Sequence, residues 1–176
     1  GEGTVTNCNF ADNKATKYGG AVYFVHQGTV TNCNFTGNTA NYDGGAIRFN
    51  GEGTVTNCNF VDNKATAVLS HGGAIYFWNQ GTVTNCNFTG NTVNYDGGAV
   101  YFVDTGTVSN CNFTGNTANR TGGAVCFYDD GNVTNCNFTD NTAASGGAVY
   151  FYDDGTVSNC NFTNNTADYA GAVFIL

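Results

Sequence analysis

The sequence predicts an all-β protein: a single-stranded, parallel, right-handed β-helix of seven rungs of about 25 residues, each with three short strands. The first observation is a repeated block, GTVTNCNF at residues 28–35, whose copies follow one another without a spacer. Those copies begin at Gly3, Gly28, Gly53, Gly81, Gly106, Gly131 and Gly155. The second observation is a Gly-Gly-Ala-Val/Ile stretch later in each copy or a close variant of it. The right-handed sense follows from the usual handedness of parallel crossover connections.

Within the second rung, we expect strands over residues 29–31, 33–36 and 46–49, because Thr, Val, Phe and Tyr favour strands whereas Gly and Asn interrupt them. Side chains alternate along a strand, so each strand has an inward set. The inward set of this rung is Val30, Cys33, Phe35, Ile47 and Phe49. Arg48 and its equivalents form a mixed column, which is typical of a surface.

Residues 1–176 form a single repeat domain, because neither spacing nor composition changes along the chain. The first four residues repeat the text of residues 51–54, and the last five form an apolar strand. We therefore expect a segment of a longer chain, with neighbouring rungs beyond it, or a filament subunit whose terminal rungs stack end to end on other copies.

The net charge of -8 makes nucleic acid an unsuitable partner, because phosphate backbones require basic surfaces. No apolar run approaches the ~18 residues of a membrane span, so we expect none in this segment.

Seven of the eight cysteines occupy one inward rung position, represented by Cys33. Their Cβ vectors should run parallel, which disfavours disulfides between rungs, so we expect buried free thiols. No cysteine or histidine spacing indicates zinc. Cys126 stands alone in the outward column, and is the candidate reactive thiol, although an idle surface cysteine is the simpler interpretation.

Asparagine is invariant at three rung positions, those of Asn32, Asn34 and Asn38. We expect Asn32 and Asn38 at corners, where asparagine tolerates the left-handed conformation, and Asn34 on the outside. Asn-x-Thr sequons provide candidate glycosylation sites, with Asn119 the most accessible because it lies in a turn. The candidates are Asn119, Asn34, Asn87, Asn112, Asn137 and Asn161.

An outward row rich in aromatic residues is a candidate binding face for cell-surface glycans or host proteins, since aromatic rings stack on sugars and on protein partners. The row comprises Tyr23, Arg48, Tyr76, Trp78, Tyr101 and Tyr150. The alternative is a stacked ladder that only stabilises the sheet.

Acidic residues gather before several rung starts. They are Asp104, Asp129, Asp130, Asp153 and Asp154. Stacked carboxylates repel one another, and a bound Ca²⁺ would relieve the repulsion. No other cofactor is indicated, and a solvated acidic edge is the simpler interpretation.

The units GTVTNCNFTGNTA and GGAVYF resemble the repeats of adhesin-like surface proteins of methanogenic archaea. They are also similar to the GGA(I/V) and FxxN repeats of chlamydial polymorphic outer-membrane proteins; here these are Gly19–Val22 with Phe10–Asn13, through to Phe162–Asn165. The resemblance covers all seven rungs and implies an extracellular, cell-surface β-helical stalk used in adhesion.

We therefore expect a non-catalytic structural or adhesive protein. One alternative is ice binding, because the Thr-x-Thr columns represented by Thr29 and Thr31 resemble the ice-binding face of insect β-solenoid antifreeze proteins. A glycan-degrading enzyme is the third candidate, on fold analogy alone. We expect no active site, because the basic residues are scattered and His26 and His71 are isolated loop residues.

Overall fold

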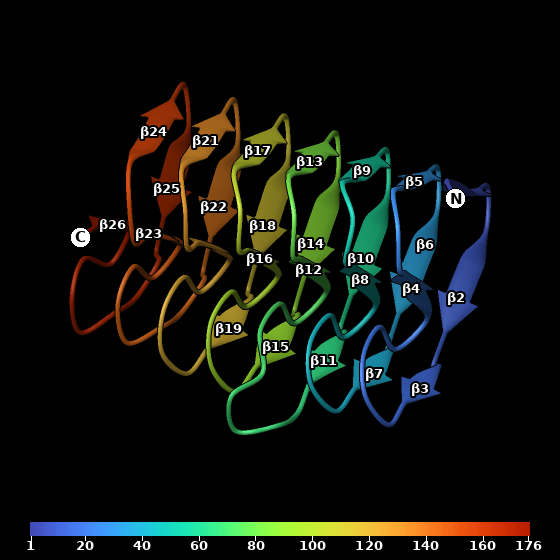
Figure 1. Ribbon diagram of the computed structural model, residues 1–176. Coiled ribbons are helices and arrows are strands. Elements are labelled where there is room, and N and C mark those ends of the chain that lie inside the picture. Colours follow the sequence, from blue (N-terminus) through green and yellow to red (C-terminus); the bar gives the residue numbers. More distant parts are fainter.

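The computed structural model describes residues 1–176 and contains a parallel β-solenoid of seven turns with no helix (Figure 1). Every strand pair is parallel, and each residue pairs with its copy one rung away, as Val5 does with Val30 and Val30 with Val55. The predicted architecture is therefore confirmed. The structure has no helix that is long and apolar enough to cross a membrane.

The strands stack into four sheets that run along the solenoid axis. Sheet A comprises β1 (Gly3–Thr6), β5 (Gly28–Thr31), β9 (Gly53–Thr56), β13 (Gly81–Thr84), β17 (Gly106–Ser109), β21 (Gly131–Thr134) and β24 (Gly155–Ser158). Sheet B comprises β2 (Asn9–Ala11), β6 (Asn34–Thr36), β10 (Asn59–Val61), β14 (Asn87–Thr89), β18 (Asn112–Thr114), β22 (Asn137–Thr139) and β25 (Asn161–Thr163). Sheet C comprises β3 (Lys14–Ala15), β7 (Thr39–Ala40), β11 (Lys64–Ala65), β15 (Thr92–Val93) and β19 (Thr117–Ala118). Sheet D comprises β4 (Val22–Phe24), β8 (Ile47–Phe49), β12 (Ile75–Phe77), β16 (Val100–Phe102), β20 (Val125–Phe127), β23 (Val149–Phe151) and β26 (Val173–Ile175).

Sheets A, B and D correspond to the three expected strands, and sheet C is a fourth, shorter one that the sequence pattern did not reveal. Its strands are only two residues long, which is too short for alternation to be visible. Isolated bridges from Thr117 through Thr142 to Thr166 continue it into the last two rungs.

Asparagine forms the corner between sheets A and B, as expected: Asn32 has a φ of 55°. The corner between sheets B and C is different, because the left-handed residue there is the one before Asn38, which is Gly37 with a φ of 65°. Asn38 itself is fully buried. Its Oδ1 accepts hydrogen bonds from the backbone N–H and the Nδ2 of Asn13, at 3.0 and 2.9 Å. This column is thus an internal amide ladder, and the prediction of a left-handed corner at Asn38 is wrong.

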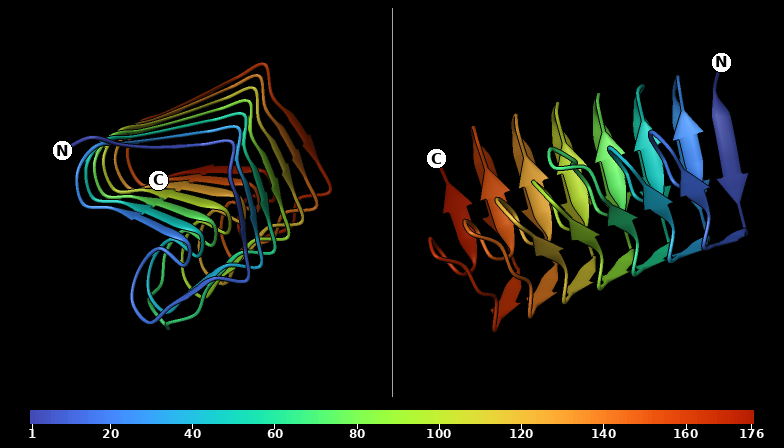
Figure 2. Two further views of the ribbon diagram at one scale, coloured as in Figure 1. Left: turned by 90° about the vertical axis from the view of Figure 1, so that its right-hand side faces the viewer. Right: turned by 90° about the horizontal axis from the view of Figure 1, so that it is seen from below.

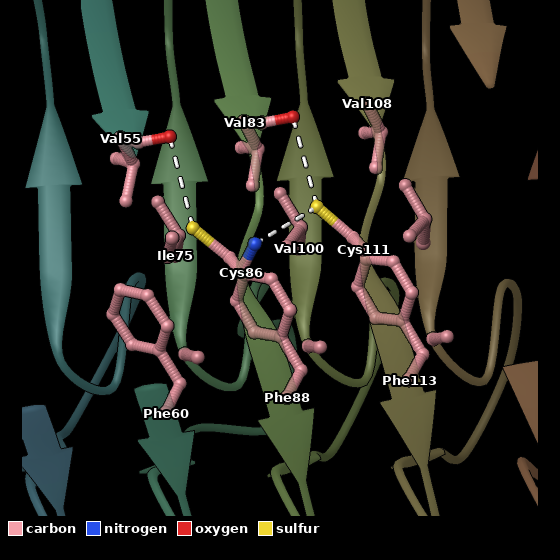
Figure 3. Packing of buried hydrophobic residues seen from close by; sticks show 14 of the residues in the cluster. Val55, Phe60, Ile75, Val83, Cys86, Phe88, Val100, Val108, Cys111 and Phe113 are labelled. Atoms are coloured by element: carbon pink, nitrogen blue, oxygen red, sulfur yellow. Dashed lines mark hydrogen bonds between the residues drawn. The ribbon is translucent and has the colours of Figure 1, made fainter. Parts of the chain in front are cut away.

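The core lies inside sheets A, B and D and contains the expected inward columns (Figure 3). Val30, Cys33, Phe35, Ile47 and Phe49 are all buried, which confirms the predicted alternation. The phenylalanine rings of neighbouring rungs stack almost parallel with centroids 4.8–5.0 Å apart, close to the spacing of paired strands.

All eight cysteines are free, and the seven-residue column points inward as predicted. The thiols form hydrogen bonds with backbone groups of the same and of neighbouring rungs. The Cys86 backbone N–H donates to Cys111 Sγ at 3.4 Å, and Cys111 Sγ lies 3.8 Å from the Val83 carbonyl oxygen (Figure 3). The Ser109 carbonyl oxygen is nearer to Cys111 Sγ, at 3.1 Å, and accepts its single S–H.

Loops between sheets C and D project from the solenoid as a separate lobe (Figure 2). We call these segments the C–D loops; in the first six rungs they are residues 16–21, 41–46, 66–74, 94–99, 119–124 and 143–148. Each returns to the core at its second glycine. A Cβ on Gly98 would lie 1.9 Å from the Gly123 carbonyl oxygen, so only glycine permits this approach. The lobe packs against the outer face of sheet D and buries most of its side chains.

Candidate binding site on the outer face of sheet D

The outward column of sheet D is covered, because the C–D loops fold back over it (Figure 2). Tyr76 is 4% exposed, Tyr101 and Tyr150 are 6% exposed, and Arg48 is 8% exposed. The predicted open aromatic face is therefore wrong for these four residues. Alternation places them outside the core but does not reveal the loops above them.

Two members of the predicted face remain accessible. Tyr23 is 43% exposed and Trp78 is 52% exposed. The covered column does stack in part: the rings of Tyr76 and Tyr101 lie 5.6 Å apart and 10° from parallel. The ladder interpretation is thus supported for this pair.

Cys126 is fully buried in the same column, so the expectation of a surface thiol is wrong. Its Sγ lies 3.4 Å from the Thr121 hydroxyl oxygen. Burial, followed by the nearby charge of Asp96, raises the pKa of this thiol well above its ordinary value. A buried, protonated thiol is a poor nucleophile.

One ionic group beneath the lobe joins the second and third rungs. Asp43 accepts a hydrogen bond from Arg48 Nη1 at 2.5 Å, and its other oxygen lies 3.1 Å from His71 Nδ1. The Arg48 guanidinium lies between two rings, with its Cζ 4.1 Å from the centroid of Tyr18 and 4.5 Å from that of Tyr76. His71 is therefore half-buried and paired, rather than an isolated loop residue.

A second ionic group lies further along the lobe and is centred on Asp96, which is 2% exposed. Thr121 Oγ1 donates to Asp96 Oδ1 at 2.6 Å, and Arg120 Nη1 donates to Oδ2 at 3.2 Å. Burial raises the pKa of Asp96, and the Thr121 hydrogen bond and the Arg120 charge partly oppose that effect. Arg120 also lies over Tyr95, at 4.5 Å from the ring centroid.

A hollow of about 200 Å³ opens between these groups. Its walls are His71, Tyr95, Asp96, Tyr101, Arg120, Tyr128 and Tyr152. The Tyr152 hydroxyl oxygen is buried and has no hydrogen-bond partner in the protein, although nearly all buried polar atoms have one. Burial raises the pKa of this phenol, and the neighbouring Thr121 hydroxyl partly opposes that effect.

Most of this hollow was not predicted from the sequence. Tyr95, Asp96 and Arg120 lie on C–D loops, which carry no strand periodicity. The sequence feature that could have pointed to the hollow is variation between copies, since these loops differ from rung to rung whereas sheets A and B hardly change.

The other candidate sites lie elsewhere on the surface. Asp129, Asp130 and Asp153 place one carboxylate oxygen each within 4.8 Å of the others, and are mostly exposed. Asp104 instead accepts a hydrogen bond from the Thr105 backbone N–H at 2.6 Å, and Asp154 lies outside the group.

The threonine columns lie outward on sheet A, where the Thr29 column is mostly exposed and the Thr31 column mostly half-buried. Their hydroxyls differ in hydrogen bonding from rung to rung. Thr134 Oγ1 donates to Asn132 Oδ1 at 3.1 Å, and Thr84 Oγ1 lies 3.1 Å from Ser109 Oγ, whereas the first three rungs have no such bonds.

Among the sequons, Asn34, Asn112, Asn137 and Asn161 are exposed, and Asn87 is half-buried. Asparagine amides in this column bond to one another, as Asn34 Nδ2 does to Asn9 Oδ1 at 2.7 Å. Asn119 is exposed at a bend on a C–D loop and lies outside this ladder.

The chain matches the family described as the right handed beta helix region over residues 1–106 and again over 73–174. It therefore belongs to that family. No curated protein matches the chain in sequence.

Proposed function

We propose that this chain is a non-catalytic, extracellular structural and adhesive β-helix that displays a binding surface along a rigid rod. The observation that supports this most directly is where the rungs differ. The core columns and sheet A are nearly uniform, whereas the outer column of sheet D runs Tyr, Arg, Tyr, Tyr, Cys, Tyr, Phe and is covered by loops of varied sequence. A constant scaffold with one varied face is typical of a binding module.

The stalk role is supported by the direction of the backbone hydrogen bonds. They join consecutive rungs along the axis, as between Gly28 N–H and the Glu52 carbonyl at 3.0 Å. Each rung is thereby fixed to its neighbours. Partners of such a rod include cell-surface glycans or host proteins on the lobe, and further rungs of the same type along the axis.

Adhesion is tested with the purified chain on beads, whose retention is measured on cells and on extracellular polysaccharide. We expect retention, a loss of at least half of it with Trp78→Ala, and no change with the matched sheet A control Thr54→Ala. Trp78 is an exposed ring beside the lobe, and Thr54 is exposed on the uniform face. Beads that bind no better than uncoated beads would overturn the adhesive role.

Ice binding is the second candidate, favoured by seven threonine-bearing strands in parallel register on sheet A. The hydrogen-bonded Asn132 and Ser109 interrupt that array, so we expect no thermal hysteresis. A freezing-point gap that Thr54→Ala and Thr82→Ala abolish would replace adhesion by ice binding.

Glycan degradation is the third candidate, and the observation in its favour is Asp96, a buried acid of raised pKa beside Arg120. Thr121 and Arg120 already occupy both of its oxygens, so we expect no release of reducing ends or unsaturated products from polysaccharides. Turnover that Asp96→Asn abolishes would establish an enzyme.

A further inference from the structure

We propose that the hollow above sheet D binds one neutral sugar unit of a glycan. This inference rests on the proposed adhesive function and specifies its site and ligand class. Three properties of the hollow support it: its balanced charge, its aromatic walls and its unused hydrogen-bonding groups.

The charges that line the hollow cancel. The Asp96 carboxylate is paired with Arg120, and His71 is paired with Asp43. No free cation is left inside to neutralise a phosphate, a sulfate or a uronate. The chain as a whole has a net charge of -8, which also opposes an anionic ligand.

Aromatic rings form the apolar part of the wall. Tyr128 is 58% exposed, and its ring centroid lies 5.6 Å from that of Tyr152 at an angle of 46°. Tyr95 is also part of the wall, and the Arg120 guanidinium lies over its ring. A pyranose ring has an apolar C–H face and hydroxyls around its edge, which suits a site with aromatic walls and a few polar groups.

Several hydrogen-bonding groups remain for the sugar hydroxyls. A guanidinium has five N–H donors, and only Nη1 of Arg120 has a hydrogen bond in the protein; its side chain is 45% exposed. His71 uses Nδ1 for Asp43, which leaves Nε2.

The size of the hollow limits the ligand. At about 200 Å³ it lies below the ~300–1,000 Å³ typical of sites for drug-sized molecules, so it fits a single ring at the end or side of a glycan chain.

The experiment uses the whole chain on an array of neutral, sialylated, uronate-bearing and sulfated oligosaccharides, followed by calorimetry with the best neutral binder. We expect binding to neutral glycans. Arg120→Lys keeps the positive charge beside Asp96 but removes the planar set of N–H donors, and should weaken binding by about tenfold, the effect of one lost hydrogen bond of ~1.4 kcal/mol. Tyr128→Ala should weaken it by at least as much, through loss of the exposed ring.

The control matched to Tyr128→Ala is Tyr169→Ala, which removes the ring of a tyrosine that is 67% exposed and lies outside the hollow. It should leave binding unchanged, and circular dichroism should show the same fold in all three variants. Retention of beads without binding to any neutral glycan, binding to acidic glycans only, or neutral binding that both hollow variants leave intact would overturn the site while adhesion stands. Failure of both bead retention and glycan binding would overturn both proposals.

Discussion

Asn91 is held inside the solenoid by hydrogen bonds on both sides of its amide. Its Oδ1 accepts from the backbone N–H and the Nδ2 of Asn63, and its Nδ2 donates to the Phe60 carbonyl and to Asn116 Oδ1, all at 3.0 Å. Asn91→Ala would strand these buried groups, each at a cost of about 1–3 kcal/mol. We expect the free energy of unfolding to fall by about 3–5 kcal/mol in denaturant titrations.

The control for this prediction is an asparagine of the outer ladder. Asn59 Nδ2 donates to Asn34 Oδ1 at 2.8 Å, but both residues are exposed, and water can replace the lost bond. Asn59→Ala should therefore cost less than about 1 kcal/mol. Equal costs at the two positions would show that burial does not set the strength of the ladder.

Strand β14 illustrates how the elements stabilise one another. Its Phe88 is fully buried, and its ring stacks on Phe60 and on Phe113 with centroids 4.8 Å away on each side. Phe88→Ala should lower the free energy of unfolding by about 3–5 kcal/mol, because it leaves a cavity between two rungs. Phe162 on β25 stacks on one side only and is half-buried, so the same substitution there should cost clearly less by the same titration. A larger loss at Phe162 would contradict this account.

The C–D loops give stability a pH dependence through Asp96. Burial raises the pKa of this carboxyl in the folded chain above its ordinary value of ~3.9. The folded state thus holds its proton more tightly than the unfolded state. The contribution of Asp96 to stability is complete below the unfolded-state pKa, and it is lost as the pH rises through the folded-state pKa.

Denaturant unfolding of the wild type and of Asp96→Asn between pH 3 and 8 isolates this effect. The free energy of the wild type relative to the variant should be highest at acidic pH and should fall to a plateau as the pH rises. A difference that grows with pH would show that Arg120 and Thr121 outweigh burial.

Across the whole molecule, the cysteine column links all seven rungs. Cys111 Sγ, for example, both accepts a hydrogen bond from the Cys86 backbone N–H and donates one to the Ser109 carbonyl, and all eight cysteines are free. We expect mass spectrometry under non-reducing conditions to find eight thiols and no bridge between rungs. In the native chain, Cys8 and Cys160 should be alkylated first because only these two are not fully buried. Bridged peptides from adjacent rungs would refute the argument from parallel Cβ vectors.

Much of the architecture was determined by the sequence itself. The repeat spacing sets the register of every strand pair, and alternation places Val30, Cys33 and Phe35 inside. The repeat spacing and the alternation can both be read from neighbouring residues, because the period is visible in the sequence and the side chains of a strand point to only two sides. The corner at Asn32 was likewise accessible, because few residues other than glycine adopt a positive φ readily.

The candidate site was decided by the tertiary structure. Alternation correctly turns Arg48 and Tyr76 away from the core, but it says nothing about a second layer, and the C–D loops that cover them have no periodicity to reveal their path. The same loops bring Asp96 to Arg120 across a full rung, beside Tyr152, which directly follows β23. A strand pattern reports which side of its own sheet a residue occupies, whereas burial and pairing depend on which distant segment packs against that side.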